Sequence, residues 1–177
     1  EVTRAFLKAQ DREADWQPLA ADPGAAYDET VEICLDTLVP LVAKPHMPDN
    51  VETVEAVGPI AVDQVFIGSC TNSSYQDMMR VARILKGKRV HPNVSLVIGP
   101  GSRQVLTMLA RNGALADMMA AGARILETAC GPCIGQWDRH AEDNERPNSI
   151  VTSFNRNFAK RADGNPNTHA FVASPEL

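Results

Sequence analysis

The chain has 177 residues, with 17 Lys and Arg against 22 Asp and Glu, a formal net charge of −5. This length can bury the core of one domain, and 44% apolar with 22% charged residues excludes a disordered or fibrous class. The acidic balance argues against nonspecific nucleic-acid binding, and no apolar run approaches the roughly 18 residues of a membrane span.

The first part of the chain carries weak structural signals. A helix is predicted over residues 3–9, an irregular stretch over 12–20 and a turn at Asp22-Pro23-Gly24. Alternating apolar residues predict an extended element over 30–39, followed by a loop punctuated by four prolines, at positions 40, 45, 48 and 59. Cys34 lies in the alternating stretch, and we expect it to be a buried, inert thiol, because unpaired cysteine is among the most buried residue types.

From residue 62 onward, strand-like and helix-like segments alternate. Strands are predicted over residues 62–69, 94–98, 123–128, 149–154 and 168–173, and helices over 74–86, 103–111 and 114–121. This order predicts an α/β fold, a three-layer αβα arrangement with a mostly parallel sheet and helices on both faces. The sequence Gly99-Pro100-Gly101-Ser102 lacks the lysine of a phosphate-binding loop, so we interpret it as a tight turn between strand and helix.

Three cysteines occupy short, unusual contexts. Cys70 ends the apolar run VFIGSC, and Cys130 and Cys133 bracket Gly131-Pro132, which gives the spacing C-x59-C-x2-C. The paired cysteines alone also fit half of a zinc site, a redox pair or a local disulfide. A closed zinc site needs four ligands, and no histidine lies within five residues of these cysteines. Three thiolates on a [4Fe–4S] cluster leave one iron open for a substrate.

The candidate residues follow predicted strands. In parallel α/β sheets, ligands bind outside the carboxyl ends of the strands. Cys70, Cys130 and the pair Asn155-Arg156 each come just after a predicted strand. Since the carboxyl ends of parallel strands meet at one edge, these residues are expected to converge there.

Three motifs carry a resemblance to a known family. The stretches IGSCTNS (67–73) and ACGPCIGQWDR (129–139) resemble the cluster-binding motifs of the aconitase family, and SFNRNFAKR (153–161) resembles its arginine-bearing substrate loop. Residues 27–33 and 168–176 also fit, so the likeness runs through the whole chain. It implies residues 1–28 as a lead-in segment from the preceding domain and 29–177 as an aconitase-type cluster-binding domain.

The resemblance also implies residue roles. Cys70, Cys130 and Cys133 would hold a [4Fe–4S] cluster, Arg156 and Arg161 would bind substrate carboxylates through the arginine fork, and Asn155 would lie beside the cluster. Lys160 stands where the family has a small residue. The family's catalytic serine belongs to another domain, so no catalytic residue is expected here.

The expected parent is a hydro-lyase, an aconitate hydratase that interconverts citrate and isocitrate through cis-aconitate. We expect this chain to be an internal fragment, inactive alone, whose partners are a tricarboxylate substrate and the remaining domains, in the cytoplasm or, in a eukaryote, the mitochondrial matrix. One alternative is the large subunit of isopropylmalate or homoaconitate dehydratase, although the bacterial isopropylmalate enzyme usually has Ser-Met in place of Gly131-Pro132. A non-catalytic iron-sensing or RNA-binding relative is the alternative of a different class.

Overall fold

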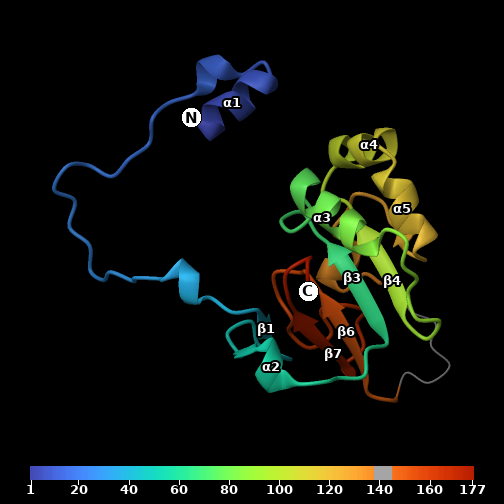
Figure 1. The fold of residues 1–177 in the computed structure, drawn as a ribbon. Coiled ribbons are helices and arrows are strands. Elements are labelled where there is room, and N and C mark those ends of the chain that lie inside the picture. Colours follow the sequence, from blue (N-terminus) through green and yellow to red (C-terminus); the bar gives the residue numbers. More distant parts are fainter. Residues whose placement is uncertain (138–144) are drawn as a thin grey trace. The chain divides into compact units, whose positions relative to one another are not determined.

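The computed structural model describes residues 1–137 and 145–177 and divides them into two units, Glu1–Leu38 and Val39–Leu177 (Figure 1). The domain boundary predicted after residue 28 remains a prediction. The polar residues of 138–148 predict a loop, of which residues 138–144 lie outside the described residues.

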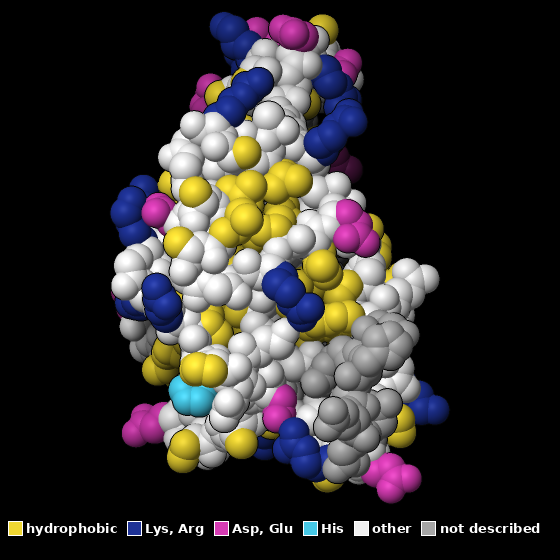
Figure 2. Space-filling model, turned by 90° about the vertical axis from the view of Figure 1, so that its right-hand side faces the viewer, with side chains coloured by type: hydrophobic (Ala, Val, Ile, Leu, Met, Phe, Trp, Pro, Cys, Tyr) yellow, Lys and Arg dark blue, Asp and Glu magenta, His cyan; other side chains and the backbone are white. Residues whose placement is uncertain are grey.

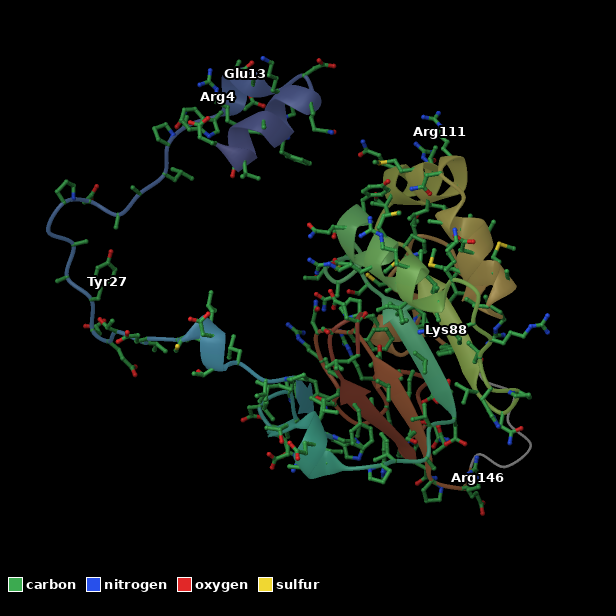
Figure 3. The ribbon with its side chains drawn as sticks, viewed as in Figure 1. Arg4, Glu13, Tyr27, Lys88, Arg111 and Arg146 are labelled. Atoms are coloured by element: carbon green, nitrogen blue, oxygen red, sulfur yellow. The ribbon has the colours of Figure 1, made fainter. Side chains whose placement is uncertain are left out.

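The first unit has little regular structure. It contains helix α1 (Val2–Ala9) and the 3-10 turns η1 (Glu13–Asp15) and η2 (Leu35–Thr37). Arg4 lies 5.4 Å from the Trp16 ring and donates a 3.0 Å hydrogen bond to Glu13, as the labelled side chains show (Figure 3). These contacts are exposed, so they stabilise this end of the chain only weakly.

The prediction that Cys34 is buried is wrong, because the thiol is exposed and free. The extended element predicted over 30–39 pairs with no strand within the described part of the chain, and η2 interrupts it. A strand with one apolar face needs a neighbouring layer to bury that face. Without one, Val31 and Ile33 are 74% and 64% exposed, and Cys34 between them stays at the surface.

The second unit is built on one sheet with strand order β2-β1-β7-β6-β3-β4-β5. Neighbouring strands from β7 to β5 run parallel, and β1 and β2 add antiparallel pairs at one side. The strands are β1 (Leu41–Ala43), β2 (Val51–Thr53), β3 (Gln64–Gly68), β4 (Ser95–Gly99), β5 (Arg124–Ile125), β6 (Asn148–Thr152) and β7 (Thr168–Val172).

The sheet reverses its winding at β3. Strands β4 and β5 follow β3 toward one edge, whereas β6 and β7 lie on the other side of β3, as the arrows in Figure 1 show. The register pairs Phe66 with Thr152 across the β3–β6 boundary. Such a reversal is the point at which ligands bind in open α/β sheets, outside the carboxyl ends of the strands.

Helices cover one face of the sheet. Helices α3 (Tyr75–Leu85), α4 (Arg103–Arg111) and α5 (Ala114–Ala120) match the predicted ranges to within a residue or two at each end. Their buried side chains pack against alternate residues of β3 and β4 in one core cluster, which contains Met78, Val81, Ala82, Leu96, Ile98, Leu109, Ala114, Met118 and Ala123. The short α2 (Val54–Val57) follows β2 directly.

The opposite face has a different covering. Phe66, Val97 and Ile150 point to this face, because side chains alternate along a strand. They pack against Phe154 and Cys133, from the irregular segment after β6 and the 3-10 helix η3 (Gly131–Ile134). The predicted α/β fold with a mostly parallel sheet is confirmed. The layer on this face consists, in its described part, of η3 and irregular chain rather than long α-helices.

Candidate metal centre

The loop that carries Cys70 is shaped by its own side chains. It begins at Gly68, whose φ of 132° and close approach to Gly99 leave no space for a Cβ atom. The Ser69 hydroxyl then accepts hydrogen bonds from the backbone of Thr71 (3.2 Å) and Asn72 (3.0 Å), and the Ser73 hydroxyl donates to the Ser69 carbonyl. These short-range bonds close a tight turn with Cys70 exposed at its tip.

Helix α3 begins directly after this turn. Ser74 and Asp77 form a reciprocal capping box, with a 3.2 Å bond to the Ser74 hydroxyl and a 3.0 Å bond to the Asp77 carboxylate. Ser and Asp at these positions are typical of a helix N-terminus, and their two bonds fix the start of α3. A Cβ atom at Gly101 would lie 2.6 Å from the Ser73 hydroxyl oxygen, so the turn before α4 supports the Cys70 loop from the side.

The loop that carries Cys130 and Cys133 is shaped by its backbone and by burial. The Cys133 amide donates to the Cys130 carbonyl at 2.8 Å within η3. Cys133 is buried in the same core cluster as Phe66, whose ring centroid lies 5.9 Å from that of Trp137. Cys130 is exposed. One cysteine of the pair is thus anchored in the core, and the other lies at the surface.

The segment after β6 carries the predicted arginines. Asn155 and Arg156 are exposed, whereas Arg161 is partly buried and its Nε atom is buried without a hydrogen-bond partner among the described residues. Lys160 has a φ of 66°, a left-handed conformation that a glycine adopts at less cost.

Direct contacts join these segments. The Asn72 side-chain nitrogen donates to the Ser153 carbonyl at 2.7 Å, and the Asn155 side-chain nitrogen donates to the Thr71 hydroxyl at 3.0 Å. Beneath them, the Gly68 amide donates to the Ser153 hydroxyl at 2.8 Å. The loop after β3 and the loop after β6 are therefore tied together at the switch point.

The paired cysteines meet the arginine segment as well. A Cβ atom at Gly135 would lie 2.9 Å from the Lys160 carbonyl oxygen and 3.3 Å from that of Arg161. The loop after Cys133 thus packs directly on the backbone that carries Arg161. All three motif segments lie in contact with at least one of the others.

Several residues of this network were not predicted. Thr71, Asn72 and Ser153 lie inside the quoted motifs, but their roles depend on partners about eighty positions away, which spacing cannot reveal. The fully buried Asn157 donates to carbonyls of Lys44 and Ala170 and fastens the arginine segment to β1 and β7. A polar residue just beyond a strand's end was the only available signal.

The donor set fits an iron–sulfur cluster. All four cysteines are free, so no disulfide competes for them. The described residues contain no group of three His, Cys, Asp or Glu side chains that could surround a single metal ion. A four-iron cluster does not require such a group, because each cysteine ligates a different iron. Three free thiols on two loops that both contact the arginine segment are the type of donor that such a cluster takes.

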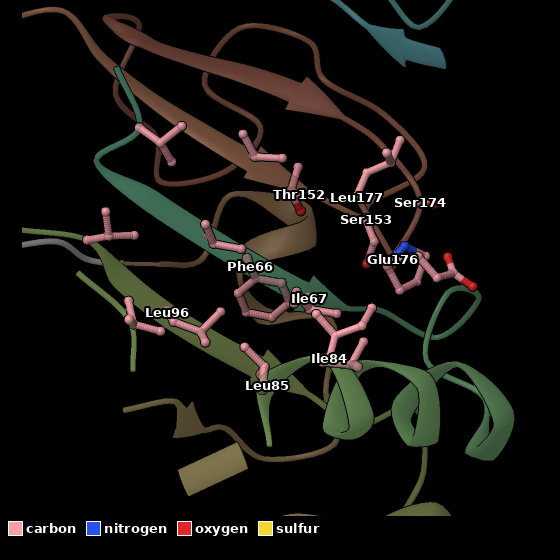
Figure 4. Close-up of a pocket in the computed structure, with 17 residues that line it drawn as sticks. Phe66, Ile67, Ile84, Leu85, Leu96, Thr152, Ser153, Ser174, Glu176 and Leu177 are labelled. Atoms are coloured by element: carbon pink, nitrogen blue, oxygen red, sulfur yellow. The ribbon is translucent and has the colours of Figure 1, made fainter. Parts of the chain in front are cut away.

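An apolar cavity of the second unit lies elsewhere. It measures about 360 Å³ and lies between α3 and the helix-covered face of the sheet, with Ile67, Ile84 and Leu96 among its apolar lining (Figure 4). The C-terminal residues Glu176 and Leu177 line its rim. None of the predicted site residues lines this cavity, so the candidate site at the carboxyl edge is separate from it.

Comparison with known proteins identifies the class. The doubly wound sheet, with its three motif segments meeting at the carboxyl edge, defines an α/β domain built to present polar loops at a switch point. The sequence profile of the aconitase family (aconitate hydratase) matches residues 55–177. The chain belongs to the aconitase family.

The relatives with high identity are hydro-lyases. The chain is 49% identical to the mitochondrial aconitate hydratase of Candida albicans and 47% identical to that of Saccharomyces cerevisiae, in both cases over 90% of this chain and 22% of the relative. It is 42% identical to 3-isopropylmalate dehydratase large subunit 1 of Thermotoga maritima, over 99% of this chain and 41% of that protein. The chain thus spans about a fifth of the aconitate hydratases.

Proposed function

We propose that this chain is the cluster-binding domain of an aconitate hydratase, which interconverts citrate and isocitrate through cis-aconitate. Cys70, Cys130 and Cys133 would hold a [4Fe–4S] cluster at the carboxyl edge. When bound, the cluster supplies an open iron that acts as a Lewis acid toward a substrate hydroxyl and carboxylate. The observation that carries the proposal is the contact of both cysteine loops with the arginine segment.

The arginines would bind the substrate. A citrate-like molecule carries up to three carboxylates, and a guanidinium pairs with a carboxylate through two parallel hydrogen bonds. Arg156 is exposed and directly follows Asn155, which bonds to Thr71 of the Cys70 loop. The unpartnered Nε of Arg161 leaves a donor available for an acceptor that comes from outside the described residues. Asn155, already bonded to Thr71, would lie beside the cluster.

Other parts of the catalytic machinery would come from remaining domains. The resemblance puts the serine that takes the carbon-bound proton in another domain, and the chain spans only 22% of the aconitate hydratases it matches. We therefore propose that the 177 residues alone carry no hydratase activity. Conversion of isocitrate to cis-aconitate by the isolated chain would contradict this.

Citrate and isocitrate are favoured over isopropylmalate as substrates. Gly131-Pro132 stands between the paired cysteines, where the bacterial isopropylmalate enzyme usually has Ser-Met, and three of the relatives with the highest identities are named aconitate hydratase. The complete protein should turn over isocitrate and not isopropylmalate; the reverse preference would assign it to the dehydratase large subunits. Because these relatives are named as mitochondrial enzymes, the proposed location is the mitochondrial matrix in a eukaryote and the cytoplasm in a bacterium.

RNA binding is the less favoured function. The net charge is −5, and on the face shown in Figure 2 the Lys and Arg side chains are interspersed with Asp and Glu. A nucleic-acid surface gathers basic residues so that phosphates displace counterions. If the protein bound RNA in a salt-dependent manner, and if Arg156 and Arg161 could be replaced without loss of turnover, RNA binding would become the favoured function.

No helix of the described residues has the length and apolarity to cross a membrane.

Anaerobic reconstitution tests the cluster assignment. Iron and sulfide should produce broad visible absorbance and, after mild oxidation, an EPR signal. Serine variants of Cys70, Cys130 and Cys133 should each lose both signals, whereas Cys34→Ser, at an exposed thiol in the other unit, should retain them. A cluster lost in Cys34→Ser, or retained in any of the other three, would refute the ligand set.

An arginine variant tests substrate binding. In the complete protein, Arg161→Lys should weaken binding and turnover of isocitrate together by about 1.5–3 kcal/mol, the range for a hydrogen bond to a charged group. Lysine keeps the charge but loses the fork, so the cluster spectrum should remain unchanged. Normal kinetics would remove Arg161 from the site, and a lost cluster would make it a structural residue.

A further inference from the structure

A chain of hydrogen bonds leads from the loop after β6 to the sulfur of Cys70. The Asn72 side-chain nitrogen donates to the Ser153 carbonyl at 2.7 Å and lies 3.4 Å from the Asn155 side-chain oxygen. The Asn155 nitrogen donates to the Thr71 hydroxyl oxygen at 3.0 Å, and that oxygen lies 3.6 Å from the Cys70 sulfur. The chain starts at a backbone carbonyl and continues through side chains of the loops after β3 and β6.

The chemistry of the groups sets the direction of each bond. A backbone carbonyl only accepts, so the nitrogen and not the oxygen of Asn72 must face Ser153. The same nitrogen then meets the oxygen of Asn155, which turns the nitrogen of Asn155 toward Thr71. Because an amide nitrogen only donates, the Thr71 oxygen is the acceptor there, and its one hydroxyl proton is left over. The Cys70 sulfur is the neighbouring acceptor for this proton.

We propose that the Thr71 hydroxyl donates a hydrogen bond to the Cys70 sulfur and thereby raises the reduction potential of the cluster that Cys70 holds. The proposal rests on the cluster ligation proposed above. A metal-bound thiolate has no proton, so only the hydroxyl can be the donor in that pair. A donor at the sulfur stabilises the more negative, reduced state of the cluster. Asn72 and Asn155 act as positioning residues that aim the hydroxyl.

The test compares Thr71→Val, which keeps the shape and removes the hydroxyl, with Thr71→Ser, which keeps the hydroxyl. Thr107→Val is the matched control, because the Thr107 hydroxyl donates to the Arg103 carbonyl on an exposed face of α4, far along the chain from the cysteines. The complete reconstituted protein is reduced by dithionite, one electron per cluster, in the presence of mediators. The reduced cluster is measured by EPR at a fixed potential.

In Thr71→Val the ratio of reduced to oxidised cluster should fall about three- to tenfold, the equilibrium equivalent of one ordinary hydrogen bond. Thr71→Ser and Thr107→Val should match the wild type. A second variant, Thr71→Ala, should behave like Thr71→Val if the hydroxyl and not the side-chain volume is responsible.

The outcomes separate this proposal from the proposed function. A wild-type protein that binds no cluster would refute the ligation itself and this proposal with it. A wild-type cluster with an unchanged ratio in both Thr71→Val and Thr71→Ala would refute only the role of Thr71. A drop in Thr71→Ser equal to that in Thr71→Val would show a packing effect and would also refute it.

Discussion

The two cysteine loops of this domain reach the same edge of the sheet by different physical means. The Cys70 loop exposes Cys70 at its tip and is held by side-chain hydrogen bonds of Asn72 and of the buried residues Ser69 and Ser73. The Cys130–Cys133 loop is held by a 3-10 turn, by burial of Cys133 in the core and by contact of Gly135 with the arginine segment. The first loop is thus set by polar contacts, and the second by packing and backbone conformation.

This difference has consequences for stability and for chemistry. A typical hydrogen bond contributes about 0.5–1.5 kcal/mol, and water can replace the bonds at the exposed tip of the Cys70 loop. A buried side chain or a backbone in a restricted conformation has no such substitute, so changes there cost more. We therefore expect substitutions in the Cys130–Cys133 loop to lower the free energy of unfolding more than substitutions in the Cys70 loop.

The largest effect is expected at Gly135. Its φ of 83° disfavours any side chain, and a Cβ atom would meet the Lys160 carbonyl oxygen at 2.9 Å, a backbone atom that cannot move alone. Gly135→Ala should lower the free energy of unfolding by about 3 kcal/mol, at the upper end of what a strained backbone position costs. Urea unfolding followed by circular dichroism measures this.

Gly164→Ala is the matched control for Gly135→Ala. Its φ is 73°, but a Cβ atom there would have nothing within 4 Å. It should therefore show the backbone cost alone, about 1 kcal/mol. Equal losses in the two variants would mean that the contact with the arginine segment contributes nothing.

The next effect concerns the cysteines without metal. Cys133→Ser puts a hydroxyl into the apolar cluster with Phe66 and Phe154 and should cost about 2 kcal/mol, as for a buried polar group without a full set of partners. Cys70→Ser, at an exposed position, should stay within about 0.5 kcal/mol of the wild type. Urea unfolding of the metal-free variants measures both losses. An equal loss of unfolding free energy in the two variants would show that the two loops do not differ in how they are stabilised.

Much of the fold was predictable from local signals. Helix α4 begins and ends as predicted at Arg103 and Arg111, because the Gly-Pro-Gly turn and the Ser102 N-cap mark its start. The two three-residue strands β1 and β2 were missed, since they lie among the prolines and pair at one side of the sheet. Cys34 was misjudged because alternation predicts a strand but supplies no partner layer for it.

The candidate site was only partly predictable. Short motifs identify the cysteines and arginines, since these residue types are rare in such contexts. The bonds of Asn72 to Ser153 and of Asn155 to Thr71 join residues from two strands that are neighbours only in the folded sheet. The directions of these hydrogen bonds, and therefore the role proposed for Thr71, can be derived only from the folded structure.

A smaller effect is expected at the capping box. Ser74→Ala removes the hydroxyl that accepts from the Asp77 amide and should cost about 1 kcal/mol. Because Ser74 also ends the Cys70 loop, the variant should increase the rate at which iodoacetamide alkylates Cys70. Ser102→Ala removes the corresponding cap of α4, whose hydroxyl accepts from Val105 at 3.1 Å, and should cost a similar amount without changing Cys70. A faster reaction in both variants would show general loosening instead.

The smallest effect lies outside both loops and tests whether the Cys70 loop depends on α3 as a whole. Arg80 of α3 donates to Glu176 at 2.7 Å, and this bond, with help from Ser174, lowers the pKa of the Glu176 carboxyl below 4.5 despite partial burial. A lowered pKa in the folded state stabilises the protein above the unfolded pKa, and that contribution is lost as the pH falls through the folded pKa.

Glu176→Gln should therefore lower the free energy of unfolding at pH 7 by about 0.5 kcal/mol, the scale of an exposed ion pair. The difference from the wild type should shrink toward zero as the pH is lowered through the range below 4.5, where Glu176 takes up its proton. Alkylation of Cys70 should remain unchanged, because the capping box and the turn at Ser69 hold that loop independently of the bond between Arg80 and Glu176. A difference in the free energy of unfolding that grows toward low pH, or a changed alkylation rate of Cys70, would contradict the independence of the Cys70 loop from this ion pair.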